Sequence, residues 1–346
     1  MEQHRDRSPR TRGPDVPTTR TSPDTGHLDT LGVRHLTVDT LEALRSATAH
    51  DLPGVAVAQL DGRAAGEVNA PDTVVRPRFV QWVADAAQGA DGLLARQSQR
   101  QRRVSRIALR AAAPLSFDIC PLSGPTLAEW SALYASQHRR HALDLGLVGF
   151  YTRAVALEST DDMLLVWRSG ATMVGGCIVN VDSAQGALRG RFCAVRDDYR
   201  DRELTRAMYL ASADVARDCG LPTVTLGADP NFFGAAIPWG LAPFKLRLGF
   251  TPVPNRVLSA RRAGDVTERV VSMAGLAGPL LRFAYPEATP EPDAAYLDGD
   301  AELCLVADCT PDDVAARRDV KARYLTVHDG SPALVRTQGD EASRSG

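Results

Sequence analysis

Two polar residues follow a short apolar run in the second half of the chain. The run Thr223–Leu226 predicts a buried strand, and it leads into Leu-Gly-Ala-Asp-Pro-Asn-Phe-Phe-Gly over residues 226–234. Ligands of α/β folds bind at the carboxyl ends of central strands, where Asp229 could orient or deprotonate an amine and Asn231 could help to bind it. The same residues also form a turn signal, and that simpler interpretation stays open.

Lysine is rare in this sequence. Of 40 lysine and arginine residues, Lys245 and Lys321 are the two lysines. Lysine and arginine are not equivalent in a tight site, so the scarcity favours a function for Lys245. The alternative is a surface lysine near the end of an amphipathic helix, with its stem packed on the protein and its ammonium group in water.

Arginines are concentrated on one predicted helix. Six of them fall between Arg96 and Arg110, with no acid after Asp91. Such a face could bind a polyanion, with Arg102, Arg103 and Arg106 as its central residues, or it could simply be solvated. A smaller cluster, His138 to His141, includes Arg140 and His141; it could meet an acceptor molecule or cap the end of a helix.

Composition excludes several classes of protein. The 40 basic and 42 acidic residues leave a net charge of −2, so bulk charge does not make the chain a polyanion binder. No apolar run reaches the roughly 18 residues that span a bilayer, and the first 30 residues lack the apolar core of a signal peptide, which predicts a cytoplasmic protein. The six cysteines include no C-x-x-C pair, so neither a metal site nor a disulfide framework is predicted.

The sequence divides into five predicted parts, which must position these candidate site residues. These are a disordered tail (1–30), an N-terminal unit with the basic helix (31–113), a core (114–260), an appendage (261–334) and a second disordered tail (335–346). In the N-terminal unit the pattern predicts a strand over Gly54–Leu60 and a helix over Phe79–Ala87. A long helix then runs over Asp91–Ala112 and ends at Pro114.

The core reads as a mixed α/β unit. Its predicted elements are a strand (Leu115–Leu122), a helix (Pro125–His138), a helix (Leu145–Leu157), three strands (Met163–Trp167, Thr172–Val181, Leu188–Val195), a helix (Leu204–Cys219) closed by Gly220, a strand (Thr223–Leu226), a helix reaching Leu248 and a strand (Thr251–Leu258). This order places Asp229 after a central strand and Lys245 on the helix that follows.

Two segments of this core resemble a known family. Residues 193–210, Cys-Ala-Val-Arg-Asp-Asp-Tyr-Arg-Asp-Arg-Glu-Leu-Thr-Arg-Ala-Met-Tyr-Leu, resemble the central motif of the GNAT acyltransferase superfamily, V-x-P-x-Y-R-G-x-G, where a strand runs into a helix. Phe-Lys-Leu-Arg-Leu-Gly-Phe over 244–250 and the Thr-Pro-Val that follows resemble the late motif F-Y-x-x-L-G-F-x-x-V. Lys245 in place of the tyrosine, with the Arg-rich segment 97–106 before the core, looks like the Fem-like branch, which includes peptidoglycan-bridge aminoacyltransferases.

The resemblance implies a GNAT-like α/β core and an N-acyltransferase activity. An acyl or aminoacyl group would pass from an activated ester or thioester to the amine of a small molecule, peptide or cell-wall precursor. Lys245 would stabilise the negative charge on the carbonyl oxygen, and Asp229 would assist the amine. The acceptor side would comprise Asn231, His141, Arg140 and Tyr209, although Tyr209 could equally be a core residue.

The donor is left open by the residues at the predicted helix N-terminus. The family binds the pyrophosphate of acyl-CoA there with a Gly-rich turn, whereas this chain has Asp201, Glu203 and Thr205. Two carboxylates would repel phosphate, which disfavours acyl-CoA; if it does bind, the candidate phosphate ligands are Arg200, Arg202 and Arg206.

Two other donors fit the sequence. An aminoacyl-tRNA could use the arginines of the 96–110 segment, and an acyl-carrier-protein thioester is also compatible. No tightly bound cofactor is expected in any of these cases. The competing interpretation is a non-catalytic GNAT-like domain that binds a ligand or a partner.

Overall fold

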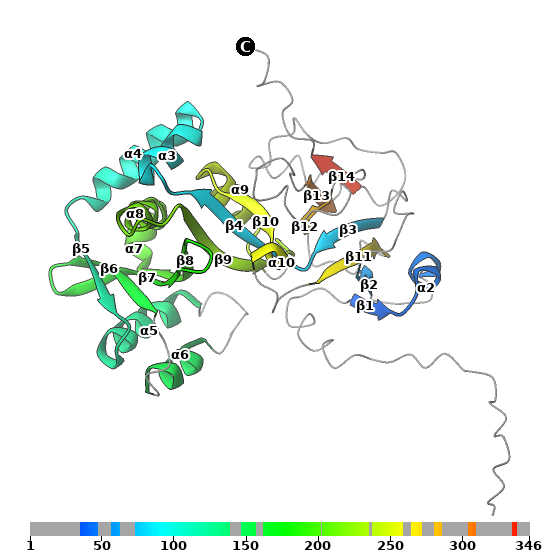
Figure 1. Ribbon diagram of the computed structural model, residues 1–346, viewed down its shortest axis with the longest axis horizontal. Helices are drawn as coiled ribbons and strands as arrows, with labels where there is room; N and C mark the ends of the chain where they lie inside the picture. Colours follow the sequence, from blue (N-terminus) through cyan, green and yellow to red (C-terminus); the bar gives the residue numbers. More distant parts are fainter. Residues whose placement is uncertain are drawn as a thin grey trace, which may run out of the picture.

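The architecture is a mixed α/β fold built around one large sheet, with smaller sheets to one side (Figure 1). The computed structural model describes residues 35–47, 57–62, 73–138, 147–156, 162–201, 203–234, 237–258, 264–271, 280–285, 304–308 and 334–337. None of the helices in these ranges combines the length and the apolar character needed to cross a membrane.

Strands and helices are interspersed along the whole chain. They are β1 (His35–Val38), α2 (Leu41–Ser46), β2 (Val57–Asp61), β3 (Thr73–Pro77), β4 (Phe79–Asp85), α3 (Gly89–Arg96), α4 (Gln99–Ala112), β5 (Ser116–Pro121), α5 (Gly124–His138), α6 (Leu147–Ala156), β6 (Met163–Ser169), β7 (Thr172–Asp182), β8 (Ala187–Val195), α7 (Asp197–Arg200), α8 (Leu204–Asp218), β9 (Thr223–Pro230), α9 (Leu241–Arg247), β10 (Thr251–Pro254), α10 (Asn255–Leu258), β11 (Asp265–Val270), β12 (Leu280–Ala284), β13 (Cys304–Asp308) and β14 (Leu334–Thr337).

The large sheet has seven strands in the order β10-β4-β9-β8-β7-β6-β5. Neighbouring strands are antiparallel except β8 and β9, which pair in parallel over Ala187–Arg189 and Thr223–Thr225. Beyond these three residue pairs the ladder between β8 and β9 ends, although both strands continue. From β5 to β10 the order of strands and helices is the predicted one apart from the short helix α7, which confirms the mixed α/β fold class.

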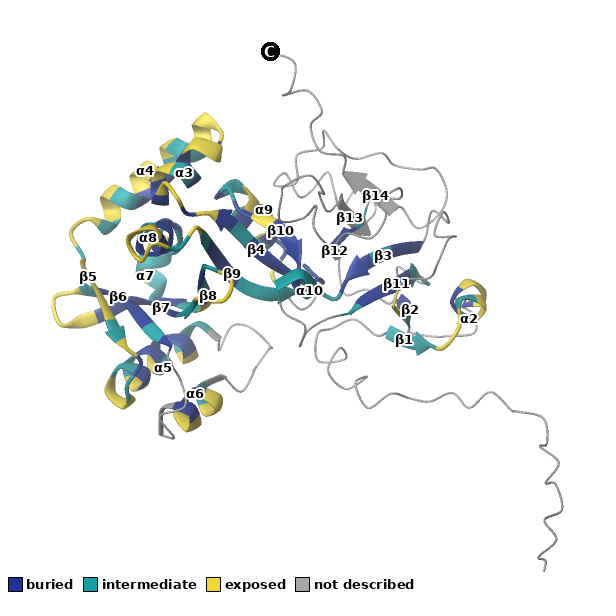
Figure 2. Ribbon diagram, in the orientation of Figure 1, coloured by how far each residue is buried: buried dark blue, intermediate teal, exposed yellow. Residues whose placement is uncertain are grey.

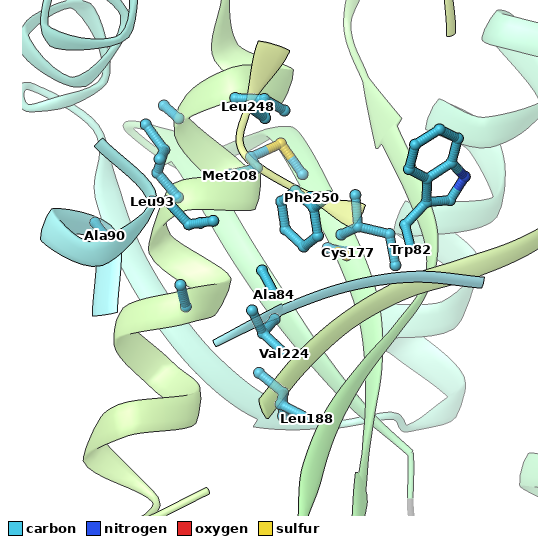
Figure 3. Close-up of a cluster of buried hydrophobic side chains, with 14 of the residues drawn as sticks. Trp82, Ala84, Ala90, Leu93, Cys177, Leu188, Met208, Val224, Leu248 and Phe250 are labelled. Atoms are coloured by element: carbon cyan, nitrogen blue, oxygen red, sulfur yellow. The ribbon is translucent and has the colours of Figure 1, made fainter. Parts of the chain in front are cut away.

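Helices cover both faces of this sheet. Helix α8 packs on β7, β8 and β9, and α3 and α4 pack on α8; α5 lies on β7 and β8 from the other side with α6 beside it (Figure 1). Successive side chains of a strand point to opposite faces of the sheet, so each strand contributes to both helical layers. Leu164 of β6 packs with residues of α5, and its neighbour Leu165 packs with residues of α8. The central strands of the sheet are accordingly buried, whereas the edge strand β5 is largely exposed (Figure 2), and Trp82, Cys177, Met208 and Phe250 belong to the buried cluster of the α8 layer (Figure 3).

The small sheets adjoin the large one through a nearly continuous strand. Residue Arg78 separates β3, in the four-stranded sheet β1-β2-β11-β3, from β4 in the large sheet. Strand β11 inserts between β2 and β3, and its buried Glu268 pairs with Arg76 of β3 and Arg282 of β12. A third sheet has the order β12-β13-β14.

The packing divides the chain differently from the predicted parts. Elements β4, α3 and α4, predicted in the N-terminal unit that ends at residue 113, join the large sheet and its α8 layer. Conversely β11, predicted in the appendage, completes the sheet that holds β1, β2 and β3. Residues 335–337, predicted as the start of the second disordered tail, belong to β14, whereas residues 1–30 and 338–346 lie outside the described ranges.

Two elements of the predicted N-terminal unit need correction. The helix predicted over Phe79–Ala87 is wrong: residues 79–85 form β4, because Val80, Trp82 and Ala84 alternate on one buried face of a central strand. The helix predicted over Asp91–Ala112 is two helices, and the Ser98 hydroxyl caps the second by accepting from the Gln101 amide at 3.4 Å. The last predicted strand is shorter than expected, since α10 begins at Asn255.

Candidate active site

A β-bulge in β9 determines which way Asp229 points. Asp229 lies opposite Val80 of β4 and Leu226 lies opposite Trp82, so two residues of β9 face one residue of β4 between these pairs. The buried Gln81 amide donates to the Leu226 carbonyl at this place. Without the extra residue Ala228 would face Val80; with it, the Asp229 side chain shares the face of Val80 and Trp82.

On that face Asp229 meets Lys245 of α9. The Lys245 ammonium group lies 2.6 Å from Asp229 Oδ2, and the indole Nε1–H of Trp82 donates to the same oxygen at 2.7 Å. The ammonium group also lies 5.4 Å from the centre of the Trp82 ring. The side chains of Lys245 and Asp229 are 4% and 14% exposed, so this is a buried ion pair rather than a snorkelling lysine.

The second carboxylate oxygen of Asp229 is available for a ligand. Among the described residues, none donates a hydrogen bond to Oδ1, whereas Oδ2 accepts two. A carboxylate held by a cation and an indole on one side, with the other oxygen unoccupied, can accept an N–H from an incoming amine. The ammonium group of Lys245 supplies the only cation in direct contact with that carboxylate within the described ranges.

Tyr209 and two cysteines border this pair. Tyr209 of α8 is half-buried, its ring centre lies 6.1 Å from that of Phe244 on α9, and its hydroxyl lies near Cys193 of β8. Loss of solvent around the hydroxyl, followed by the nearby Cys193, Cys177 and Asp229, raises the pKa of Tyr209 well above its usual range. Tyr209 therefore stays protonated at neutral pH and can donate a hydrogen bond.

A carboxylate of the protein itself, that of Glu203, lies beside the N-terminus of α8 without capping it by a hydrogen bond. Glu203 is the residue before the helix and has φ 61°, the one positive φ outside glycine in the described ranges. Its carboxylate lies 3.0 Å from Nε of Arg206, whose side chain is 6% exposed. A phosphate at this position would meet the negative charge of Glu203 and would compete with it for Arg206.

Arg206 also connects α8 to the basic helix and to α9. Its guanidinium donates to the Ser105 hydroxyl at 3.4 Å and lies 5.3 Å from the centre of the Phe244 ring. Ser105 in turn donates to Gln97, whose amide donates to the Leu248 carbonyl at 3.0 Å. Of the three predicted donor ligands near this helix, Arg206 is thus fully engaged, Arg200 is half-buried on α7, and Arg202 lies outside the described residues.

Helix α4 carries the predicted basic face on its outer side. Ser105 and Ala108 are its buried residues, and opposite them a surface hollow is lined by Gln99, Arg100, Arg102, Arg103, Arg106 and Arg110. None of these five arginines forms an ion pair with an acid in the described part of the chain. The stripe at positions 99, 103, 106 and 110 follows the helical repeat, so its positive charges lie along one side.

The predicted acceptor residues have different positions. Asn231 is fully buried, and its amide nitrogen donates to the carbonyls of Pro77 and Phe283 at 2.8 and 2.7 Å while its oxygen accepts from the Phe283 amide. Its polar atoms are used to join β12 to the β3–β4 strand, which argues against acceptor binding. Arg140 and His141 lie outside the described residues.

Sequence reasoning missed Trp82, which holds Asp229. Trp82 lies in the helix predicted over Phe79–Ala87, and the partial alternation of apolar Val80, Trp82 and Ala84 with polar Gln81 and Asp85 is the one strand signal in that run. The pairing of Cys177 with Cys193 was missed too, because a separation of 16 positions matches no motif.

Comparison with known proteins gives distant structural similarity. No family model and no curated protein matches the chain. Similar solved structures include FemX (12% identity, TM-score 0.43, covering 68% of this chain and 80% of that one) and L-PGS from Bacillus licheniformis (12%, 0.39, 65% and 72%). A tandem GNAT protein from the clavulanic acid biosynthesis pathway is similar at 12% identity (TM-score 0.34, 63% and 65%).

These structures include both groups that the sequence resembles, GNAT and Fem. At such identities and TM-scores they transfer no residue role and no substrate to this chain. Its fold class follows from the strand order, and its chemistry from the residues around Asp229.

Proposed function

We propose that the protein is an acyl- or aminoacyl-transferase that moves an acyl group from an activated ester or thioester to an amine. The observation that supports this best is the buried Lys245–Asp229 pair, which a bulge places where the β8–β9 ladder has ended. Bulges that re-aim a side chain are frequent next to active sites.

The pair offers the two functions that direct acyl transfer needs. The amine nitrogen attacks the carbonyl carbon, a C–N bond forms, and the carbonyl oxygen becomes negatively charged before the C–O or C–S bond breaks. Lys245 is placed to stabilise that oxygen, and Oδ1 of Asp229 to accept the proton that the amine loses, which then passes to the leaving group. The protonated Tyr209 supplies a further hydrogen-bond donor nearby.

The donor that fits best is an aminoacyl-tRNA. Glu203 and its ion pair with Arg206 occupy the place that a CoA pyrophosphate would need, whereas the hollow on α4 offers five arginines without acidic partners among the described residues. A carrier-protein thioester is compatible with both observations, because the arm that carries its acyl group has a single phosphate in place of the CoA pyrophosphate. The acceptor is an amine on a small molecule, a peptide or a cell-wall precursor.

One observation favours a second candidate, a GNAT-like domain that binds a ligand without catalysis. Lys245 is 4% exposed and already paired at 2.6 Å, as expected of an ion pair that fixes α9 to β9. In this case the pair stabilises the fold and contacts no substrate.

Activity assays on matched variants separate the two candidates. Acetyl-CoA and a mixture of tRNAs charged with radiolabelled amino acids are each offered with primary amines (lysine, spermidine, glucosamine and a stem pentapeptide). We expect amide formation with charged tRNA, and we expect Lys245→Ala to lower its rate by about 10²–10³-fold. Leu246→Ala, at an exposed neighbour on α9, is the control.

Circular dichroism shows whether each variant is folded. A folded Lys245→Ala protein with the rate of the wild type contradicts the catalytic role. Absence of any amide product, together with a small molecule that copurifies and is detected by mass spectrometry, supports the binding domain instead.

A further inference from the structure

Two cysteine side chains face each other across the middle of the large sheet. Cys177 of β7 and Cys193 of β8 are direct partners in an antiparallel ladder, and their sulfur atoms lie 2.7 Å apart. Directly opposed residues of such a ladder have Cα atoms about 4.5–5.5 Å apart, within the range that a disulfide bridges. The two thiols can therefore be joined without moving either strand.

The two thiols differ in access to solvent. Cys177 is completely buried, whereas Cys193 is half-buried and lies near the Tyr209 hydroxyl. The hydrogen bond with Cys193, together with burial, raises the pKa of Cys177 well above its usual range. An oxidant therefore reaches Cys193 first, and Cys177 lies in position to react second.

We propose that Cys177 and Cys193 form a reversible cross-strand disulfide when the protein meets a peroxide. In the first step Cys193 attacks the peroxide, an S–O bond forms and the O–O bond breaks, which leaves a sulfenic acid and water or an alcohol. In the second step the Cys177 sulfur attacks that sulfenic sulfur; the S–S bond forms, the S–O bond breaks, and the hydroxide leaves as water with the Cys177 proton. The cysteines lose two electrons, and the peroxide gains them.

This modification changes the surroundings of Tyr209 beside the candidate site. Once Cys193 is in a disulfide it has no S–H to offer the nearby Tyr209 hydroxyl, and the Tyr209 ring lies 6.1 Å from that of Phe244 on the helix that carries Lys245. Oxidation of the pair does not depend on the proposed transferase activity, because the disulfide follows from the geometry of β7 and β8 alone.

Mass spectrometry of the full chain tests the proposal. The reduced protein is treated with hydrogen peroxide, its remaining thiols are blocked with N-ethylmaleimide, and it is digested with trypsin. We expect residues 169–189 and 192–196, which arginine cleavage separates, to be recovered as one linked peptide that dithiothreitol splits. Because Cys177 must lose its proton in the second step, the linked peptide should form faster as pH rises.

Two variants and a control make the result specific. Cys177→Ala should leave Cys193 to accumulate as sulfenic or sulfinic acid with no linked peptide, and Cys193→Ser should leave Cys177 unmodified. Cys219→Ala, at an exposed free cysteine, should form the linked peptide as the wild type does. The proposal is overturned if residues 169–189 and 192–196 are recovered separately, each with an alkylated cysteine, while Cys219 is already oxidised.

Discussion

The ammonium group of Lys245 lies 2.6 Å from the carboxylate of Asp229 because an extra residue in β9 turns that carboxylate towards α9. Regular alternation would put Asp229 on the opposite face of the sheet, with the α5 layer. The bulge, the buried Gln81 that binds its carbonyl and the indole of Trp82 together hold an acid beside a lysine in an apolar layer.

The coupling between Lys245 and Asp229 should be large. Both side chains are at least 86% buried, and removing one partner of a buried pair leaves the other charge without compensation. In a double-mutant cycle with Lys245→Met and Asp229→Asn, we expect a coupling free energy of about 2 kcal/mol from urea unfolding.

An exposed pair provides the comparison for that cycle. Arg196 and Asp198 lie 2.7 Å apart with side chains 41% and 54% exposed, so the same cycle with alanine should give between about 0 and 1 kcal/mol. Equal coupling in the two cycles would show that Lys245 and Asp229 are effectively solvated and would remove the argument for a buried site.

Gly227 should tolerate no side chain. It lies within the bulge, and a Cβ added there would stand 2.8 Å from the Arg191 carbonyl oxygen of β8, a backbone atom that cannot move aside. We expect Gly227→Ala to lower the free energy of unfolding by about 1–3 kcal/mol, measured in urea. Gly124→Ala, where a Cβ meets nothing within 4 Å, is the control and should be close to neutral. Equal stability of the two variants would mean that β8 and β9 are free to separate there.

Much of this fold could be predicted because local patterns and tertiary structure agree. Helix α8 shows the 3.6-residue repeat and ends before Gly220, which has the positive φ of 71° that a helix terminus favours in glycine. Strands β6, β7 and β8 likewise begin and end within a few residues of the predicted limits. Lys245 and Asp229 were each predicted as site residues from their types and positions.

What the sequence could not show is how distant segments meet. A bulge is one extra residue relative to a partner strand, so it has no meaning until β4 and β9 are paired. Strand β4 itself is buried by helices and strands that follow it by a hundred residues or more, and its short apolar run suits a helix equally well. Trp82 was misplaced for that reason, and Asn231 was assigned to a ligand although it binds backbone of β12.

Free acetyl-CoA should bind weakly. Glu203 holds the N-terminus of α8 and pairs with Arg206 at 3.0 Å, so calorimetry on the wild type should show no dissociation constant below about 0.1 mM, or −5.5 kcal/mol. Glu203→Gly removes the carboxylate, frees Arg206 and suits the backbone, since φ there is 61°. We expect this variant to bind acetyl-CoA at least about tenfold more tightly.

Glu203→Gln distinguishes charge from space at this position. It keeps the volume of the side chain and removes its charge, so its affinity for acetyl-CoA should fall between those of the wild type and Glu203→Gly. A micromolar dissociation constant in the wild type would contradict the prediction and would make Arg200, Arg202 and Arg206 the phosphate ligands to test.

The arginines of α4 should make tRNA binding sensitive to salt. Each phosphate that an arginine neutralises on a nucleic acid releases about 0.7–0.9 counterion, so three to four contacts give a log–log slope of affinity against salt near −3. Arg103 and Arg106 are exposed and Arg102 is half-buried, so replacing all three by serine should leave the unfolding free energy within about 1.5 kcal/mol while the slope flattens. Filter binding of uncharged tRNA between about 50 and 300 mM salt measures both slopes.

The matched control replaces Arg153, Arg196 and Arg217 by serine. These arginines lie outside α4, so this variant should keep the slope of the wild type. Equal slopes for the wild type and the α4 variant, or no binding at the lowest salt, would exclude this helix as a tRNA-binding surface and leave a carrier-protein thioester as the donor to test.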